Sequence, residues 1–278
     1  MSKKSKNWKI AGAVAAGVIA LSATLATTVS ATPSQPAAQA ATVADHHGPK
    51  PTVVLIHGAF ADGSSWNGEV AELQRDGYPV IAPDVPLRGV AADAAYITSI
   101  VRNINGPIVL VGHSYGGDIA TEVAANDPQQ IKGIVYAAAY IPQAGDTALA
   151  LTTQFPGSLL GPDTSYTVNT PEGTDLYIKP AAFHALFAGD RSSSQAAVAA
   201  ATQRPIAQAA LVEQAAASVP AGIPLYAIVA SQDKAIPPAA EEFMAQRSGA
   251  TIYTVNSAHD IPVTHPQTIV SVIERAAR

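Results

Sequence analysis

The chain has 278 residues, of which 48% are hydrophobic and 13% are charged, and its formal net charge at pH 7 is −5. This length suits one large α/β domain or two small ones, and the apolar share is ample for a buried core. Cysteine is absent, which excludes disulfide bonds and lipid attachment through cysteine.

The first 40 residues have the pattern of a secretory signal. Four lysines lie within residues 1–9, and residues 10–31 carry no charge; this order is typical of a signal peptide. Small residues allow cleavage after Ala31 or after Ala40. A membrane anchor is the alternative, because about 20 apolar residues span a bilayer, but this stretch is rich in Ala, Thr and Ser rather than Leu. We expect residues 1–40 to be removed and the protein to be secreted, with no stable membrane association.

The charge of the remaining chain limits its partners. Removal of residues 1–40 takes away four lysines and no acid, so the formal charge falls from −5 to −9. An acidic protein is a poor partner for nucleic acid and for an anionic membrane. We therefore expect neutral small molecules as ligands, and no pattern in the sequence predicts an oligomeric state.

Strand-like and helix-like patterns alternate through most of the chain. The predicted strands are short, largely apolar runs, at 51–58, 78–84, 107–114, 131–142, 222–230 and 250–256. The predicted helices carry capping residues or end signals, at 62–77, 89–104, 115–127, 237–249 and 266–278. This alternation predicts an α/β fold of about six mostly parallel strands flanked by helices.

The alternation lapses between residues 143 and about 219. Pro, Gly, Thr and Ala are frequent there, with short helical patterns and only a hint of a strand at 175–180. An irregular insertion in a regular core is typical of a functional lid. We expect residues 41–278 to form one domain with a helical cap at about 143–219. The apolar and aromatic candidates in this cap for roofing a site are Phe155, Tyr166, Tyr177, Phe183, Leu186 and Phe187.

The segment Gly112-His113-Ser114-Tyr115-Gly116 lies between a predicted strand and a predicted helix. The glycines alone fit an ordinary strand–turn–helix connection. The pattern G-x-S-x-G in this context also predicts a nucleophile elbow, in which the turn presents the serine hydroxyl.

An acid and a base follow the elbow in the order that this architecture uses. Asp233 lies just past one later strand and His259 past the last, where catalytic groups gather in open α/β sheets. A serine hydroxyl needs a base to become a nucleophile, and histidine is suited to that role. Asp146 is the rival acid, but it lies several residues beyond its strand. We predict Ser114, His259 and Asp233 as a catalytic triad.

Backbone amides near the elbow are candidates for stabilising a developing oxyanion. The turn points the amide of Tyr115 toward this position, and a second donor is expected from the loop after the first strand. Ala59 is the first choice there and Phe60 is the alternative. The sequence carries no cofactor or metal pattern beside these groups, so we expect chemistry without either.

These motifs together resemble the α/β-hydrolase superfamily, and within it the small carboxylesterase group of salicylate-type methylesterases, hydroxynitrile lyases and pyrethroid-type esterases. The resemblance covers nearly everything from Pro51 onward. It rests on "VLIHGAF", "VGHSYGG", "SQDKAIPP" and "SAHDIPVTHP". It implies Ser114, Asp233 and His259 as the triad. Lyases of the group carry a lysine after the histidine, whereas Asp260 stands here, which disfavours lyase activity.

The expected function is hydrolysis of small neutral carboxylic esters through an acyl-enzyme. Phe60, Phe183 and Phe187 are the candidates for substrate binding, because small-molecule pockets are lined mainly by apolar groups. The alternative is a small-molecule receptor with little turnover, since a fold does not fix a function. Repeated turnover of model esters distinguishes the two.

Overall fold

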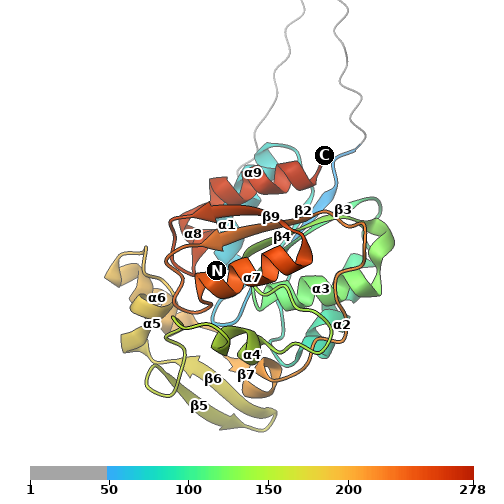
Figure 1. Cartoon of the computed structure of the whole chain (residues 1–278). Coiled ribbons are helices and arrows are strands. Elements are labelled where there is room, and N and C mark those ends of the chain that lie inside the picture. The colour runs from blue at the N-terminus through green and yellow to red at the C-terminus, as the bar shows by residue number, and fades with distance from the viewer. Residues whose placement is uncertain (1–48) are drawn as a thin grey trace, which may run out of the picture. The chain divides into compact units, whose positions relative to one another are not determined.

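Six parallel strands form the central sheet, in the order β2-β1-β3-β4-β8-β9 (Figure 1). The computed structural model describes residues 49–278, so the expected signal segment lies outside the described residues. The strands of this sheet are β1 (Thr52–Ile56), β2 (Val80–Ile81), β3 (Ile108–Ser114), β4 (Ile131–Ala139), β8 (Leu225–Ala230) and β9 (Thr251–Val255). The predicted α/β fold with six mostly parallel strands is confirmed.

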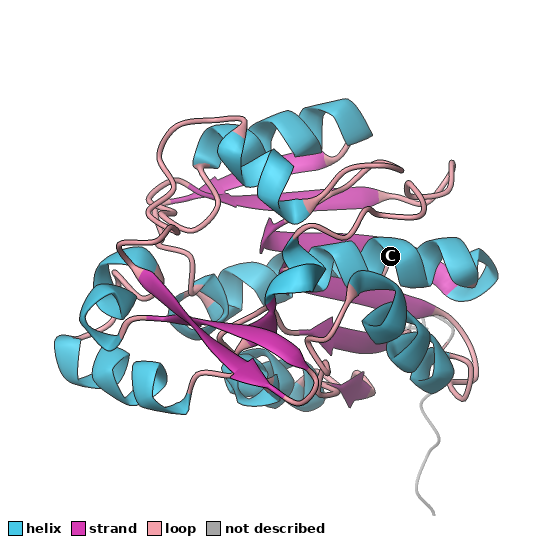
Figure 2. Cartoon of the chain, turned by 90° about the horizontal axis from the view of Figure 1, so that it is seen from below, coloured by secondary structure: helices cyan, strands magenta, loops and turns pink. Residues whose placement is uncertain are grey.

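Helices cover both faces of this sheet (Figure 2). The α-helices outside the cap are α1 (Asn67–Arg75), α2 (Val90–Val101), α3 (Gly116–Asn126), α7 (Pro238–Ser248), α8 (Ile261–Thr264) and α9 (Pro266–Ala276). Two short 3-10 helices, η1 (Gly63–Trp66) and η2 (Pro128–Gln130), precede α1 and β4. Within residues 49–278, no helix has both the length and the apolar character needed to cross a membrane.

Alternate residues of each strand enter two separate cores. Val53 and Leu55 of β1 pack on the face covered by α1 and α9, whereas Val54 and Ile56 pack on the face covered by α2, α3 and α7. Successive side chains of a strand point to opposite faces. The uninterrupted apolar runs in the sequence are therefore strands that are buried on both sides.

The chain between β4 and β8 forms the cap. It contains α4 (Ala148–Thr153), β5 (Ser165–Thr170), β6 (Gly173–Ile178), α5 (Pro180–Leu186), α6 (Ser193–Thr202), β7 (Ile206–Ala207) and the 3-10 helix η3 (Gln208–Leu211). Strands β5, β6 and β7 form an antiparallel sheet of their own, which lies below the main sheet in Figure 1.

The expectation of a helical cap is therefore incomplete. The segment at 175–180 does contain a strand, β6, but its partners β5 and β7 were not predicted. Strand β5 (SYTVNT) is mostly polar and largely exposed, so it lacks the apolar face that marks a half-buried strand. Strand β7 has only two residues, and they pair with residues of β6 that lie 30 and 32 positions earlier in the chain, a contact that local pattern does not encode.

The order of the strands creates one special point at the carboxyl ends of the sheet. β1 pairs with β2 on one side and with β3 on the other, so the chain changes direction across the sheet between β1 and β3. Ligands bind at such a switch point in open α/β sheets. The loop after β1 and the turn after β3 meet there.

Candidate active site

Ser114 ends β3 at the sharp turn into α3. Its φ is 53°, in the left-handed region that residues with a side chain rarely adopt. In the neighbouring strand Ala138 has φ 45°, and the pairing of β3 with β4 shifts between His113 and Ser114. Such backbone strain concentrates at functional sites, where the surrounding structure enforces it. The turn has the form predicted for a nucleophile elbow.

Two glycines permit the elbow to lie against the end of β1. A Cβ atom on Gly116 would lie 2.2 Å from the carbonyl oxygen of Ile56, and one on Gly58 would lie 2.6 Å from the Cβ of Ser114. Both separations are far below van der Waals contact. Only glycine allows the backbone to approach this closely, so these residues bring the loop after β1 up to Ser114.

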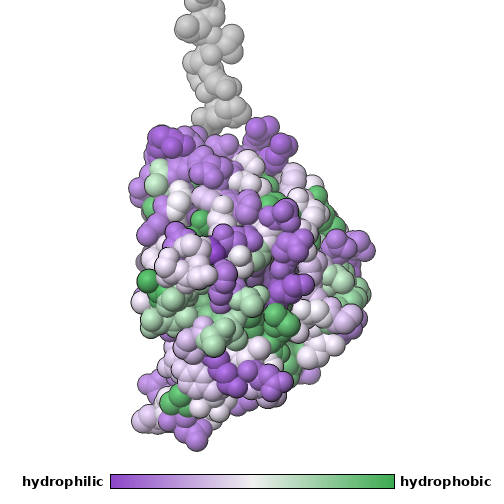
Figure 3. Space-filling view, turned by 90° about the vertical axis from the view of Figure 1, so that its left-hand side faces the viewer, coloured by the Kyte–Doolittle hydropathy of each residue, from purple (hydrophilic) through white to green (hydrophobic). Residues whose placement is uncertain are grey.

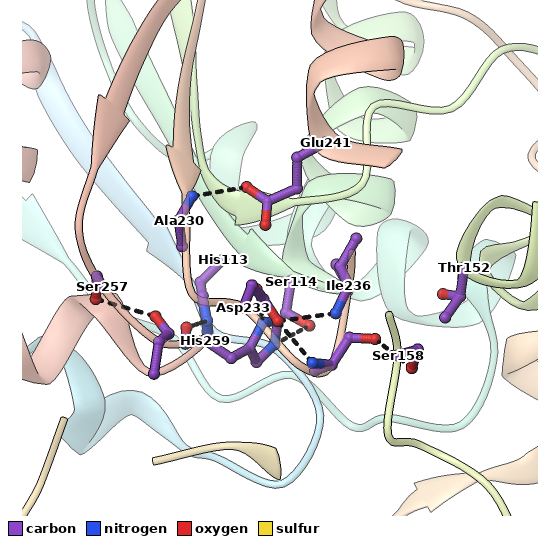
Figure 4. A network of polar contacts seen from close by, with 12 residues as sticks. His113, Ser114, Thr152, Ser158, Ala230, Asp233, Ile236, Glu241, Ser257 and His259 are labelled. Atoms are coloured by element: carbon purple, nitrogen blue, oxygen red, sulfur yellow. Dashed lines mark hydrogen bonds and ion pairs between the residues drawn. The ribbon is translucent and has the colours of Figure 1, made fainter. Parts of the chain in front are cut away.

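The structure brings the three predicted triad residues together (Figure 4). Nε2 of His259 lies 2.9 Å from Oγ of Ser114, and Nδ1 of His259 lies 2.5 Å from Oδ2 of Asp233. The His259 and Asp233 side chains are buried, and Ser114 is 7% exposed. The three residues come from the ends of β9, β8 and β3. The geometry gives His259 a hydroxyl on one nitrogen and a carboxylate on the other.

Asp233 is held by the backbone that follows it. Its Oδ1 accepts the amides of Ala235 at 2.6 Å and Ile236 at 2.9 Å, which leaves Oδ2 for His259. Glu241 of α7 lies nearby and accepts the amide of Ala230 at 3.1 Å. Burial, and then the charge of Asp233, raise the pKa of Glu241 well above its usual range. Burial in this position therefore favours the neutral form of Glu241.

The two predicted oxyanion donors come from the elbow, where Tyr115 follows Ser114, and from the loop after β1, where Ala59 lies. The amide of Phe60, the alternative, donates to the carbonyl oxygen of Arg204 in the cap at 2.8 Å. Within residues 49–278 no protein acceptor is found for the amides of Ala59 and Tyr115. The phenol of Tyr115 points away from the site and donates to Asp93 at 2.9 Å. The N–H groups of Ala59 and Tyr115 are thus available to donate hydrogen bonds to a substrate oxygen.

Two further histidines support the site without joining the triad. Nε2–H of His113 donates to the carbonyl oxygen of His259 at 2.9 Å. His57 donates from Nδ1 to the carbonyl of Gly58 and accepts the amide of Val85 at Nε2, at 2.9 and 2.8 Å. Burial lowers the pKa of both side chains, and His259 lowers that of His113 further. Both are neutral ties between loops. The contacts to Val85 and His259 join residues far apart in the chain, so no local sequence pattern reveals them.

The rival acid has another role. Asp146 pairs with Arg247 of α7 and accepts the amide of Gln143 at 2.8 Å. It closes the turn where the cap begins, and the acid position beside His259 belongs to Asp233.

Two cavities are lined by residues of the cap, and no triad residue is in the wall of either one. The larger has a volume of about 660 Å³ and no acidic, basic or histidine side chain in its wall. Tyr140 joins it to the elbow, because its amide donates to the carbonyl of Ser114 at 3.3 Å while its side chain lines the cavity. Two of the aromatic residues expected to roof the site, Phe155 and Tyr166, are in this wall. The other wall residues that sequence reasoning did not single out include Thr152, Leu176 and Leu211; scattered over α4, β6 and η3, they form no local pattern.

The three phenylalanines predicted for substrate binding gather around the smaller cavity, of about 250 Å³. Phe187 lies against His259, with ring centroids 5.0 Å apart, and contacts both Phe60 and Phe183. Ser114 is not in the wall of this cavity. Figure 3 looks onto the side of the molecule on the left in Figure 1, where apolar residues gather among polar ones. A substrate role for the three phenylalanines stays a prediction.

Two carboxyl groups are buried near His259 outside the triad. Glu69 of α1 is 0% exposed, and neither of its oxygens has a hydrogen-bond partner in the described part of the chain. Burial raises its pKa to about 8, and the nearby Asp260 contributes in the same direction. Burial raises the pKa of Asp260 to about 7, although Arg191 opposes this shift. Ionisation of either group in the folded protein is therefore costly. Among residues 49–278 no group of three or more His, Cys, Asp or Glu side chains is arranged to hold a metal ion.

Comparison with known proteins agrees with this architecture. Residues 53–272 match the model of the alpha/beta hydrolase family, and the chain belongs to that family. It is 31% identical over 110 residues to a carbendazim-hydrolysing esterase of Nocardioides sp. (strain SG-4G), which covers 35% of this chain and 46% of that protein. It is 32% identical over 106 residues to a pyrethroid hydrolase of Sphingobium wenxiniae, with 34% and 38% covered.

These alignments span less than half the length of either relative. The crystal structure of polyneuridine aldehyde esterase superposes with a TM-score of 0.70 at 18% identity, covering 82% of this chain and all of that one. At this identity the similarity defines the fold. The resemblance that the sequence motifs indicated is confirmed.

The buried Glu69 predicts an unusual dependence of stability on pH. The folded chain keeps a proton on Glu69 up to about pH 8, whereas the unfolded chain loses it near the ordinary pKa of 4.5. The folded state therefore binds the extra proton, and this contribution to stability is lost as the pH rises through that window. We expect Glu69→Gln to stabilise the protein by about 2–4 kcal/mol at high pH and to have little effect at low pH. Thermal unfolding at about pH 5 and pH 9 measures this.

The matched control is Glu172→Gln, which removes an exposed carboxylate from the turn between β5 and β6. It should unfold like the parent at both pH values. If the Glu69→Gln variant and the parent showed the same pH dependence, Glu69 would not titrate in this window.

Proposed function

We propose that this protein is a serine esterase that hydrolyses small neutral carboxylic esters through an acyl-enzyme. One observation carries the proposal: a single imidazole, on His259, is hydrogen-bonded to both Ser114 and Asp233. This is the arrangement that turns a weakly nucleophilic hydroxyl into an attacking group. The adjacent amides of Ala59 and Tyr115 support the proposal.

In the first half of the reaction, Oγ of Ser114 attacks the ester carbonyl carbon while Nε2 of His259 takes the hydroxyl proton. Asp233 accepts the Nδ1–H bond, which fixes the tautomer of His259 and stabilises its positive charge. The amides of Ala59 and Tyr115 donate to the oxyanion, and one such donor is typically worth about 3–4 kcal/mol of barrier. The intermediate collapses when His259 returns the proton to the leaving alcohol oxygen.

The second half repeats these roles with water. His259 takes a proton from a water molecule as the water oxygen attacks the acyl carbon on Ser114. The carbonyl oxygen of this acyl group accepts hydrogen bonds from the same two amides, those of Ala59 and Tyr115. Collapse of the intermediate releases the carboxylic acid and returns the proton to Oγ of Ser114. Every proton moves through Nε2 of His259, so the protein needs no other acid or base.

The larger cavity favours a neutral substrate of moderate size. The 660 Å³ cavity lies in the range of small-molecule sites, which are mainly apolar with a few polar groups that fix orientation. A charged substrate would lose its hydration there without a partner of opposite charge. The cap helices α4, α5 and α6 have six, seven and ten residues, too short for the large apolar lid of a lipase that acts at an oil surface.

Replacement of the nucleophile tests the mechanism. We expect Ser114→Ala to lower kcat about 10⁴-fold or more, because the covalent intermediate can no longer form. Mass spectrometry after treatment with a fluorophosphonate should find the label on Ser114. Ser99→Ala on α2 serves as the control and should keep full activity. A label on another residue, or an active Ser114→Ala variant, would contradict the assignment. Binding of esters without repeated turnover would instead favour the receptor alternative.

The cavity also predicts a limit on substrate length. We expect p-nitrophenyl butyrate to have a higher kcat/KM than the palmitate ester, with no rise in rate when palmitate exceeds its solubility. Leu211→Trp should lower kcat/KM for butyrate, because Leu211 lines the larger cavity. Val168→Trp, on the exposed strand β5, is the control that should change nothing. Interfacial activation with preference for palmitate would point to a lipase.

We further propose that the protein is exported and loses its first 31 or 40 residues. The support is the lysine-rich start and the uncharged stretch of residues 10–31. N-terminal sequencing of the protein in the culture medium should begin at residue 32 or 41. Full-length protein found only in the membrane fraction would favour the anchor instead.

A further inference from the structure

One carboxylate of the cap accepts two hydrogen bonds from the loop that carries His259. Asp190 follows α5, and its Oδ2 accepts the backbone amide of Ala258 at 2.7 Å and the hydroxyl of Ser257 at 2.8 Å. Ser257 and Ala258 are the two residues immediately before His259. The Asp190 side chain thus ties the cap to the core at the position of the candidate base.

A second set of contacts holds the other side of the same loop. The amide of Asp260 donates to the carbonyl oxygen of Phe187 at 3.1 Å, and Nη2 of Arg191 lies 2.7 Å from Oδ2 of Asp260. His184 of α5 lies with Nε2 2.9 Å from the carbonyl of Arg191, which anchors this cap segment. Residues 187–191 of the cap therefore contact the loop on both sides of His259, at residues 257 and 258 before it and at residue 260 after it.

The loop depends on such contacts because it has no regular structure. Strand β9 ends at Val255 and α8 begins at Ile261. The core supplies the bond from His113 to the carbonyl of His259 and one from the amide of Gln232 to Ser257. Catalytic groups must stay within about 0.5 Å of their productive positions, and a displaced backbone would move both ring nitrogens of His259.

If Asp190 served only to stabilise the fold, its loss would lower the free energy of unfolding and would leave the kcat of the folded enzyme unchanged. Asp190 is exposed at the surface, so its removal leaves no buried charge without a partner. The hydroxyl of Ser257 also lies 3.0 Å from the carbonyl of Ala258 and 3.3 Å from Oγ1 of Thr264, so it keeps other partners. Loss of Asp190 removes the acceptor of the buried amide of Ala258 and should release the backbone just before His259.

We propose that Asp190 is a positioning residue for the triad: its carboxylate holds Ser257 and Ala258 so that His259 stands between Ser114 and Asp233. The inference rests on the proposed esterase function. It makes the cap a part of the catalytic machinery as well as a cover for the substrate. Substrates that displace the stretch 187–191 would thereby also disturb the base.

The test compares Asp190→Ala with Asp190→Asn. The alanine variant should lower kcat about 10–100-fold, since small misplacements of reacting groups cost this much. KM should stay within about twofold of the parent, because Asp190 is in the wall of neither cavity. The asparagine variant keeps an oxygen that accepts both bonds and should restore most of the activity. Glu172→Ala, which removes an exposed cap carboxylate, is the matched control and should behave like the parent.

Two further measurements separate positioning from stability. The final extent of Ser114 labelling by a fluorophosphonate gives the concentration of folded enzyme, and each kcat is divided by this concentration. The rate of the same labelling should fall in Asp190→Ala. The downfield proton NMR signal of the Nδ1–H of His259 should broaden or shift in that variant alone. Parent-like kcat in Asp190→Ala, or a loss that disappears after this normalisation, would overturn the inference. Failure of the parent and of Glu172→Ala to be labelled at Ser114 would instead count against the proposed function.

Discussion

The hydrogen bond between Ser114 and His259 joins residues 145 positions apart in the chain. It requires that the ends of β3 and β9 be brought to one edge of the sheet and held there to within a fraction of an ångström. The common direction of the parallel strands meets the first requirement, although β4 and β8 lie between β3 and β9. The second depends on loops that have little regular structure, and the rest of the site consists largely of contacts that fix these loops.

The cap supplies many of these contacts. Arg204 accepts the amide of Phe60 in the loop after β1. Leu159 donates its amide to Lys234, and Ser158 donates its hydroxyl to Ala235, in the loop that carries the acid. Together with the bonds to the histidine loop, the cap reaches three of the loops around the site. A cap bonded to the core in this way holds the loops that carry the candidate site residues.

Two features of the site cost free energy of folding: strained backbone and buried carboxyl groups. The non-glycine residues with positive φ in the described chain are Phe60, Leu87, Ser114 and Ala138; the last two form the elbow and its bulge, and Leu87 and Phe60 bond to the cap. Glu69, Asp260 and Glu241 are buried carboxyl groups near His259 or Asp233, with pKa values raised by burial. Natural proteins depart from local rules at functional sites and compensate elsewhere in the fold, here through two well-packed cores.

The sequence by itself determined the parallel core, because strands buried on both faces leave long apolar runs that helices separate. It also determined the elbow and the order of Ser114, Asp233 and His259, since each follows a strand that such runs reveal. Only the tertiary structure decided that the amide of Phe60 is engaged, that the cap contains the sheet β5-β6-β7, and that Asp190 reaches the histidine loop. These features depend on pairs of residues far apart in the chain, whose contact leaves no periodic pattern in either segment.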